Sequence, residues 1–131
     1  MANFYTISSD DDQDGSVDKN ESAIDPANGK YMYNLGGNTV IDLDESPTIF
    51  IGKTYGVNNI TFTGGCTSQH IAFDHLGRPH NGLGSATNNY SQYMASDCII
   101  TFGFADASIA PLAITVTKET GHTFIAGQDT L

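Results

Sequence analysis

The densest group of metal-ligating side chains in this sequence lies near its start, between residues 10 and 21. This stretch reads DDDQDGSVDKNE and holds six carboxylates against one lysine, a local net charge of −5. Carboxylates so close together repel one another unless a cation relieves the repulsion. The residue types therefore point to the binding of a divalent cation.

The spacing within residues 10–21 matches an EF-hand-like calcium loop. Oxygen donors stand at positions 1, 3, 5, 7, 9 and 12, and the seventh residue would offer its backbone carbonyl. Gly15 occupies position 6, where glycine permits a sharp bend, and Val17 is the apolar residue that such loops turn inward. The predicted Ca²⁺ ligands are Asp10, Asp12, Asp14, Ser16, Asp18 and Glu21.

The flanks of this loop differ from those of a helix–loop–helix pair. Residues 4–7 look strand-like, and residues 22–24 leave room for at most one helical turn before Pro26. We therefore expect an isolated calcium loop of the extracellular type; the alternative is a solvated acidic loop that binds nothing. Four other acids lack ligand spacing and are expected to be surface charges: Asp25, Asp42, Asp44 and Glu45.

The overall charge limits the partners of the protein. Its 131 residues, which predict a single domain over 1–131, contain 15 acidic and 5 basic side chains, a net charge of −10. Nucleic acid and anionic membrane surfaces need basic patches, so both are excluded as partners. No apolar run approaches the roughly 20 residues of a membrane span, and we expect no signal peptide.

Short strands separated by turns are predicted from residue 30 to residue 126, the β-rich core of the domain. Apolar alternation is clear at Ile60 and Phe62 and again at Ile100 and Phe102, and residues 118–121 are typical of a hairpin loop. The expected fold class is mainly β, with an antiparallel sheet. The predicted strands are 39–43, 48–51, 59–63, 69–74, 98–103, 112–118 and 122–126.

The two cysteines, Cys66 and Cys98, favour a disulfide that closes a loop of about 30 residues. An even cysteine count and a calcium loop both suit an oxidising compartment. Two reduced cysteines in a cytosolic protein remain the alternative. A zinc site of Cys66, His70, His75 and Cys98 is a weaker hypothesis, because no pair has the usual zinc-ligand spacing.

Catalytic chemistry has little support, and we expect that the protein is not an enzyme. Asp74 and His75 are adjacent strand residues that face opposite sides, and no nucleophile elbow or phosphate-binding loop occurs. Arg78, the only arginine, is expected to hold its loop by bonding to carbonyl groups or to a carboxylate such as Asp74. A second hypothesis is a secreted calcium-binding β module that binds carbohydrate or protein through the loop 77–93, with Tyr90 and Tyr93 stacking on sugars.

Residues 71–79, IAFDHLGRP, resemble a strand and turn of minor pseudopilins and pilin-like proteins, most closely the H-type minor pseudopilin of type II secretion and its type IV pilus counterparts. ITVTKETGHTFI resembles the closing hairpin of that family. The cysteine pair and the acidic loop look like those of a disulfide-bearing subset. The resemblance covers roughly residues 56–126.

The resemblance implies a periplasmic or cell-surface head domain with a pilin-type antiparallel sheet, from a family that is α+β at full length. Family members begin with a prepilin cleavage site and a long hydrophobic helix, which this sequence does not contain, and reach the membrane only through that helix. The implied function is a structural subunit of a type II secretion or type IV pilus-like apparatus. Its implied partners are other pilin or pseudopilin subunits.

Overall fold

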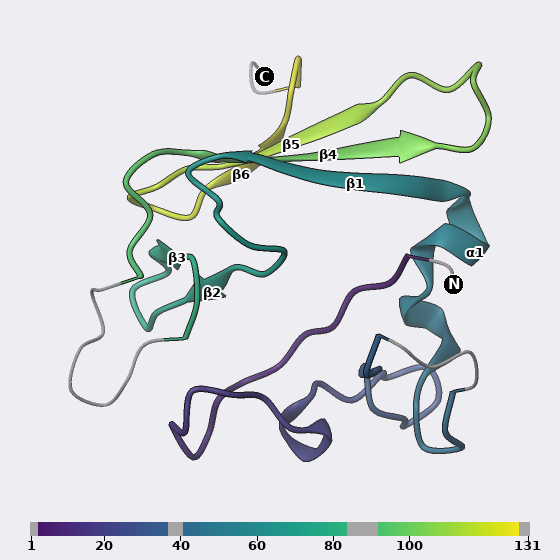
Figure 1. Ribbon diagram of the computed structural model, residues 1–131. Helices are drawn as coiled ribbons and strands as arrows, with labels where there is room; N and C mark the ends of the chain where they lie inside the picture. Colours follow the sequence, from purple (N-terminus) through teal and green to yellow (C-terminus); the bar gives the residue numbers. More distant parts are fainter. Residues whose placement is uncertain (1–2, 37–40, 84–91, 129–131) are drawn as a thin grey trace. The chain divides into compact units, whose positions relative to one another are not determined.

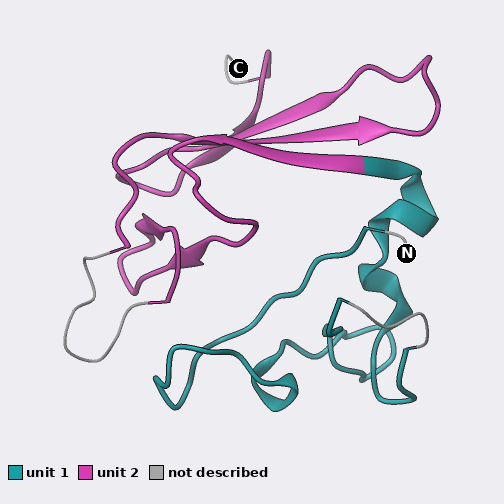
Figure 2. Ribbon diagram, in the orientation of Figure 1, with its two compact units in different colours: residues 1–58 teal, residues 59–131 magenta. Residues whose placement is uncertain are grey.

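A computed structural model describes residues 3–36, 41–83 and 92–128 of the chain. The chain divides into two compact units, Met1–Asn58 and Asn59–Leu131 (Figure 2). The prediction of one domain over residues 1–131 stays a prediction. None of the helices in the described ranges is long and apolar enough to cross a membrane.

Unit 2 is built on a four-stranded antiparallel sheet with strand order β1-β4-β5-β6 (Figure 1). The mainly β class and the antiparallel sheet expected from the alternation are therefore confirmed. Residues 118–121 form the hairpin loop between the last two strands, as predicted. The strands of this sheet are β1 (Val57–Gly64), β4 (Cys98–Phe104), β5 (Leu112–Val116) and β6 (Thr123–Ile125).

A second, two-stranded antiparallel sheet joins β2 (Ala72–Phe73) to β3 (Pro79–His80). The predicted strand 69–74 is thus reduced to two residues. Asp74 N donates to the carbonyl of Arg78 at 3.1 Å, which closes the turn between the two strands.

One face of the four-stranded sheet is apolar because alternate residues of a strand share a face. Cys98 and Ile100 of β4 lie opposite Val116 and Ile114 of β5. The buried cluster at this end of the face contains Cys66, Met94, Cys98 and Val116, with Phe62, Ile71 and Ile100 packed against it. The core therefore gathers where the segment between β1 and β4 covers the sheet.

Unit 1 contains no named strand before Val57 among its described residues. It holds three short helices: η1 (Lys19–Glu21), η2 (Pro47–Ile49) and α1 (Ile51–Tyr55). Isolated bridges join Ser8 to Ser22, Ile24 to Tyr31 and Tyr31 to Glu45. Its buried apolar residues are Ile49, Phe50 and Val57, whereas its buried polar residues are Ser22, Asp25, Asn34, Glu45 and Ser46.

The predicted strand at 48–51 is wrong, because η2 and the start of α1 occupy these residues. Ser46 caps η2 by accepting a hydrogen bond from Thr48 N at 3.3 Å, and Pro47 suits the first helical turn. Gly56 ends α1 in the left-handed conformation at φ 71°. The predicted strand 39–43 lies partly outside the described residues, and Leu43 stands in a turn.

Candidate metal centre

Residues 10–21 form a loop whose two ends are held side by side. Ser9 N donates to Glu21 O at 3.0 Å, and Ala23 N donates to Ile7 O at 2.8 Å. A β-bridge and one turn of 3₁₀ helix therefore stand where a helix–loop–helix pair would have two helices. The expectation that residues 22–24 allow only a helical turn agrees with this arrangement.

Within the loop, carboxylates accept hydrogen bonds from backbone amides two residues further along. Asp12 Oδ1 accepts from Asp14 N at 3.1 Å, and Asp14 Oδ1 accepts from Ser16 N at 2.8 Å and from Ser16 Oγ at 2.6 Å. Gly15 has φ +87°, which an L side chain rarely adopts. The chain therefore curls around the carboxylates with glycine at the bend.

Glu21 reaches back across the loop from its far end. Its Oε1 accepts from Asp11 N at 2.9 Å, and its Oε2 accepts from Asp18 N at 2.9 Å. Asp18 is the N-cap of η1, and the two residues form a capping box. The carboxylate at the twelfth position is thus held at the loop by local backbone groups.

Carboxylate oxygens of Asp10, Asp12 and Glu21 all lie within 4.8 Å of one another. The Oδ1 atom of Asp10 is buried and has no hydrogen-bond partner among the described residues. The hydrogen bond from Asp14 N lowers the pKa of Asp12, but desolvation and the neighbouring negative charges outweigh it. The net result is a pKa raised above the usual value of an aspartate. This cluster could hold a metal ion, because oxygen ligands suit Ca²⁺ and a cation relieves the repulsion.

Three of the six predicted ligands, Asp10, Asp12 and Glu21, are therefore brought together. Ser16 donates hydrogen bonds from its amide and its hydroxyl to the Asp14 carboxylate, and Asp18 caps the helical turn. The carboxylate of Asp14 also has its pKa lowered by the hydroxyl and the amide of Ser16. Asp14 and Asp18 lie outside this cluster of side-chain carboxylates, and the predicted ligand role of the Ser16 backbone carbonyl stays a prediction.

Lys19 lies inside the acidic loop and is held by acids from another segment. Its Nζ lies 2.8 Å from Asp42, 3.0 Å from Asp44 and 3.0 Å from Glu45 carboxylate oxygens. These carboxylates, Asp42 first, raise the pKa of Lys19.

The expectation that four acids are surface charges holds for Asp42 and Asp44 but is wrong for Asp25 and Glu45, which are 5% and 2% exposed. Asp25 accepts hydrogen bonds from the hydroxyls of Ser46 and Thr48, and Glu45 pairs with Lys19. These partners satisfy the buried carboxylates, which sequence spacing alone did not reveal.

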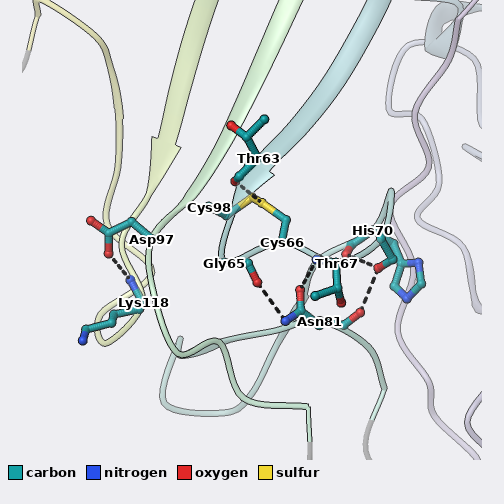
Figure 3. Close-up of a disulfide and its surroundings, with 10 residues drawn as sticks. Thr63, Gly65, Cys66, Thr67, His70, Asn81, Asp97, Cys98 and Lys118 are labelled. Atoms are coloured by element: carbon teal, nitrogen blue, oxygen red, sulfur yellow. Dashed lines mark hydrogen bonds between the residues drawn. A yellow bond between two sulfur atoms is a disulfide. The ribbon is translucent and has the colours of Figure 1, made fainter.

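The Cys66–Cys98 disulfide is present, as predicted, with 5.0 Å between the Cα atoms (Figure 3). Asn81 supports the turn that carries Cys66. Its Nδ2 donates to Gly65 O at 2.9 Å, and its Oδ1 accepts from Thr67 N at 2.9 Å. Because both sulfur atoms are bonded to each other, the zinc hypothesis loses its two thiolate ligands.

Asp74 is the centre of a polar cluster in unit 2. Its Oδ2 accepts from Arg78 Nε at 2.8 Å and lies 3.0 Å from Nε2 of His80, which is 5% exposed. Its Oδ1 accepts from the amides of Leu76 and Arg78. The predicted pairing of Arg78 with Asp74 is confirmed, whereas His80 was missed because nothing in the local sequence marks it.

We expect Asp74→Asn to lower the free energy of unfolding at pH 7. In acid, the difference in this free energy between the variant and the wild type should become smaller. The contacts with His80 and the turn hold the pKa of Asp74 well below its usual range. A carboxyl with a depressed folded pKa adds stability above its unfolded pKa of about 4 and loses it as the pH falls below that value. Urea unfolding at pH 7 and pH 3 measures both differences.

The exposed turn carboxylate Asp106 provides the control for this measurement, since it accepts hydrogen bonds only from Ser108 among the described residues. Asp106→Asn should change stability less than Asp74→Asn at pH 7. Equal losses in the two variants would contradict a special role for the Asp74 cluster.

Of the two tyrosines considered for sugar stacking, Tyr93 lies among the described residues. Tyr93 is partly buried and forms an isolated bridge with His80, and the two rings contact each other edge to face at 5.6 Å. Tyr90 lies outside the described residues. The contact with His80 shows that Tyr93 packs against the β2–β3 region.

Comparisons with models of protein families, with curated proteins and with solved structures found no match to this chain.

Proposed function

We propose that this protein is the calcium-stabilised, disulfide-bonded head of a pilin-like subunit, with a structural role in a type II secretion or type IV pilus-like apparatus. The observation that carries the proposal is that the two segments resembling the family lie against each other. Gly121 packs so tightly on the carbonyl oxygen of Gly77 that a Cβ atom at position 121 would overlap it. The turn of residues 71–79 and the closing hairpin thus form one structural element.

The apolar face of the sheet gives further support. At the disulfide end, Cys98 and Val116 are buried, whereas Phe102, Leu112 and Ile114 further along the same face are only partly buried. A sheet with one apolar face requires another element against it. The long apolar helix that begins members of the family has the chemistry to cover these side chains.

Calcium is the ion that best fits the acidic loop. Asp10, Asp12 and Glu21 would supply carboxylate oxygens, and the glycine bend and the far-end glutamate match the calcium-loop pattern. Bound calcium would neutralise charge within the loop and hold its two ends together. We assign the ion a stabilising role, because the cluster lies in a loop closed by hydrogen bonds at its base.

Calcium should raise the melting temperature of the protein relative to EDTA. An ion that binds only the folded state adds about 2.7 kcal/mol of stability at a hundredfold excess over its Kd. Asp12→Asn, which changes a cluster ligand, should remove most of the calcium-dependent increase. Differential scanning calorimetry with millimolar calcium or EDTA measures the effect.

Asp11→Asn is the matched control, because it removes the same charge from the adjacent residue, whose Oδ1 accepts a hydrogen bond from Ser9 instead of joining the cluster. This variant should keep its calcium response. Identical melting in calcium and EDTA would overturn the calcium site. Equal losses in the two variants would reduce the effect to general charge screening.

The subunit role is tested by the coding sequence immediately upstream of residue 1. We expect a prepilin cleavage motif followed by about 20 apolar residues, the length of a membrane span. A plain signal peptide in that position would contradict the pilin-like role and favour a secreted calcium-binding module.

A further inference from the structure

In the part of the chain that the structure describes, the side chain of Lys19 joins the calcium loop to the turn at Asp42–Glu45. Lys19 lies in η1, between Asp18 and Glu21, at the tenth position of the loop. Its Nζ contacts the carboxylates of Asp42, Asp44 and Glu45 at 2.8–3.0 Å. These contacts join two segments that are more than 20 residues apart in the sequence.

Glu45 makes this link different from an ordinary surface ion pair. Exposed ion pairs contribute little, but the Glu45 side chain is 2% exposed, so its charge depends on its partners. Its Oε2 accepts from Asn34 Nδ2 at 3.3 Å and from Asp42 N at 3.2 Å, which leaves Oε1 to the Lys19 ammonium. Loss of the ammonium would leave this buried carboxylate without its only cation among the described residues.

Two of the groups that place Lys19 belong to the calcium loop. Glu21 is both a member of the metal cluster and the residue that closes the capping box around η1. Asp18 N donates to Glu21 Oε2, so movement of the Glu21 carboxylate moves the helical turn that carries Lys19. An ion that fixes Glu21 therefore also fixes the position of the ammonium.

The Asp42–Glu45 turn in turn holds the interior of unit 1. Tyr31 N donates to Asp44 O at 2.8 Å, and Ser46 N donates to Tyr31 O at 2.8 Å. The hydroxyl of Ser46 donates to Asp25 Oδ2 at 2.6 Å, which connects the turn to the other buried carboxylate. Ordering of residues 42–46 thus reaches the polar interior of the unit.

We propose that Lys19 couples the two segments, so that calcium binding at residues 10–21 orders the Asp42–Glu45 turn and the polar interior of unit 1. We call this coupling the latch. The inference rests on the proposed calcium site and adds a regulated element to it. By linkage, the coupling is reciprocal: an ordered turn favours calcium binding as much as calcium favours the ordered turn.

Hydrogen exchange measured by NMR, with calcium and with EDTA, tests the latch. In the wild type, calcium should slow exchange of the amides of Asp42, Glu45, Ser46 and Thr48 by about fivefold or more, the lower end of typical coupling. Lys19→Met should abolish this slowing while calcium still protects amides within residues 10–21. Lys53→Met should retain the calcium-dependent slowing, since Lys53 is exposed on α1 and forms no ion pair with any described residue.

A double variant guards against unfolding caused by an unpaired buried charge. Lys19→Met with Glu45→Gln removes both charges and should also lose the calcium-dependent protection of residues 42–48. If that protection persists in either Lys19 variant, or if calcium protects only residues 10–21 of the wild type, the latch is overturned and the calcium site stands. If the wild type binds no calcium by titration calorimetry, both the calcium site and the latch are overturned.

Discussion

Removal of the Cys66–Cys98 disulfide is expected to lower the free energy of unfolding by about 3–4 kcal/mol. The two residues are separated by 32 positions, and the bond restricts the unfolded chain over that loop. Cys98 is fully buried and Cys66 nearly so, which places the bond within the cluster that closes one end of the sheet. The double variant Cys66→Ala with Cys98→Ala should therefore melt about 11–15 °C lower than the wild type.

Urea unfolding with and without a phosphine reductant provides the measurement. The reductant should shift the midpoint of the wild type toward that of the double variant and leave the double variant unchanged. Thiol titration of the unfolded, untreated protein should find no free thiols. An unchanged midpoint in wild-type protein that titration shows to be reduced would contradict the expected stabilisation.

Gly121→Ala should lower the free energy of unfolding by about 2–4 kcal/mol. Gly121 has φ +67°, and an added Cβ would overlap the Gly77 carbonyl and press on the ring of Phe73. The left-handed backbone penalises a side chain by about 1 kcal/mol, and overpacking against a backbone atom adds about 1–3 kcal/mol. The variant thus tests the contact between the turn of residues 71–79 and the closing hairpin.

Gly127→Ala separates conformational strain from this contact. Gly127 has φ +84°, and a Cβ there would meet nothing within 4 Å. This variant should lose only about 1 kcal/mol in urea unfolding. Equal losses in the two variants would mean that the Gly77–Gly121 contact adds nothing to stability.

The four strands of the large sheet could be predicted because their signal is local. Ile60 with Phe62 and Ile100 with Phe102 alternate along single strands, and each pattern requires only neighbouring residues. The missed helical turns also carried local signals, Ser46-Pro47 at the start of η2 and Gly56 at the end of α1. There, capping chemistry outweighed the β-branched residues that favoured a strand.

Pairings between distant residues could not be predicted in the same way. The carboxylate partner of His80 and the two backbone groups held by Asn81 depend on how the segment between β1 and β4 folds back. The burial of Asp25 and Glu45 likewise depends on Ser46, Thr48 and Lys19. No spacing rule links these residues, because their proximity arises only when the chain is folded.

The acidic loop marks the division between the two sources of information. By itself, the sequence determined the order of carboxylates, the glycine at the bend and the glutamate at the end, because a calcium loop draws its ligands from one short stretch. Only the tertiary structure decided that Asp10, Asp12 and Glu21 converge and that Lys19 turns toward Glu45. Side-chain direction and burial depend on contacts across the fold, and these decide which of several like charges share a site and which are paired elsewhere.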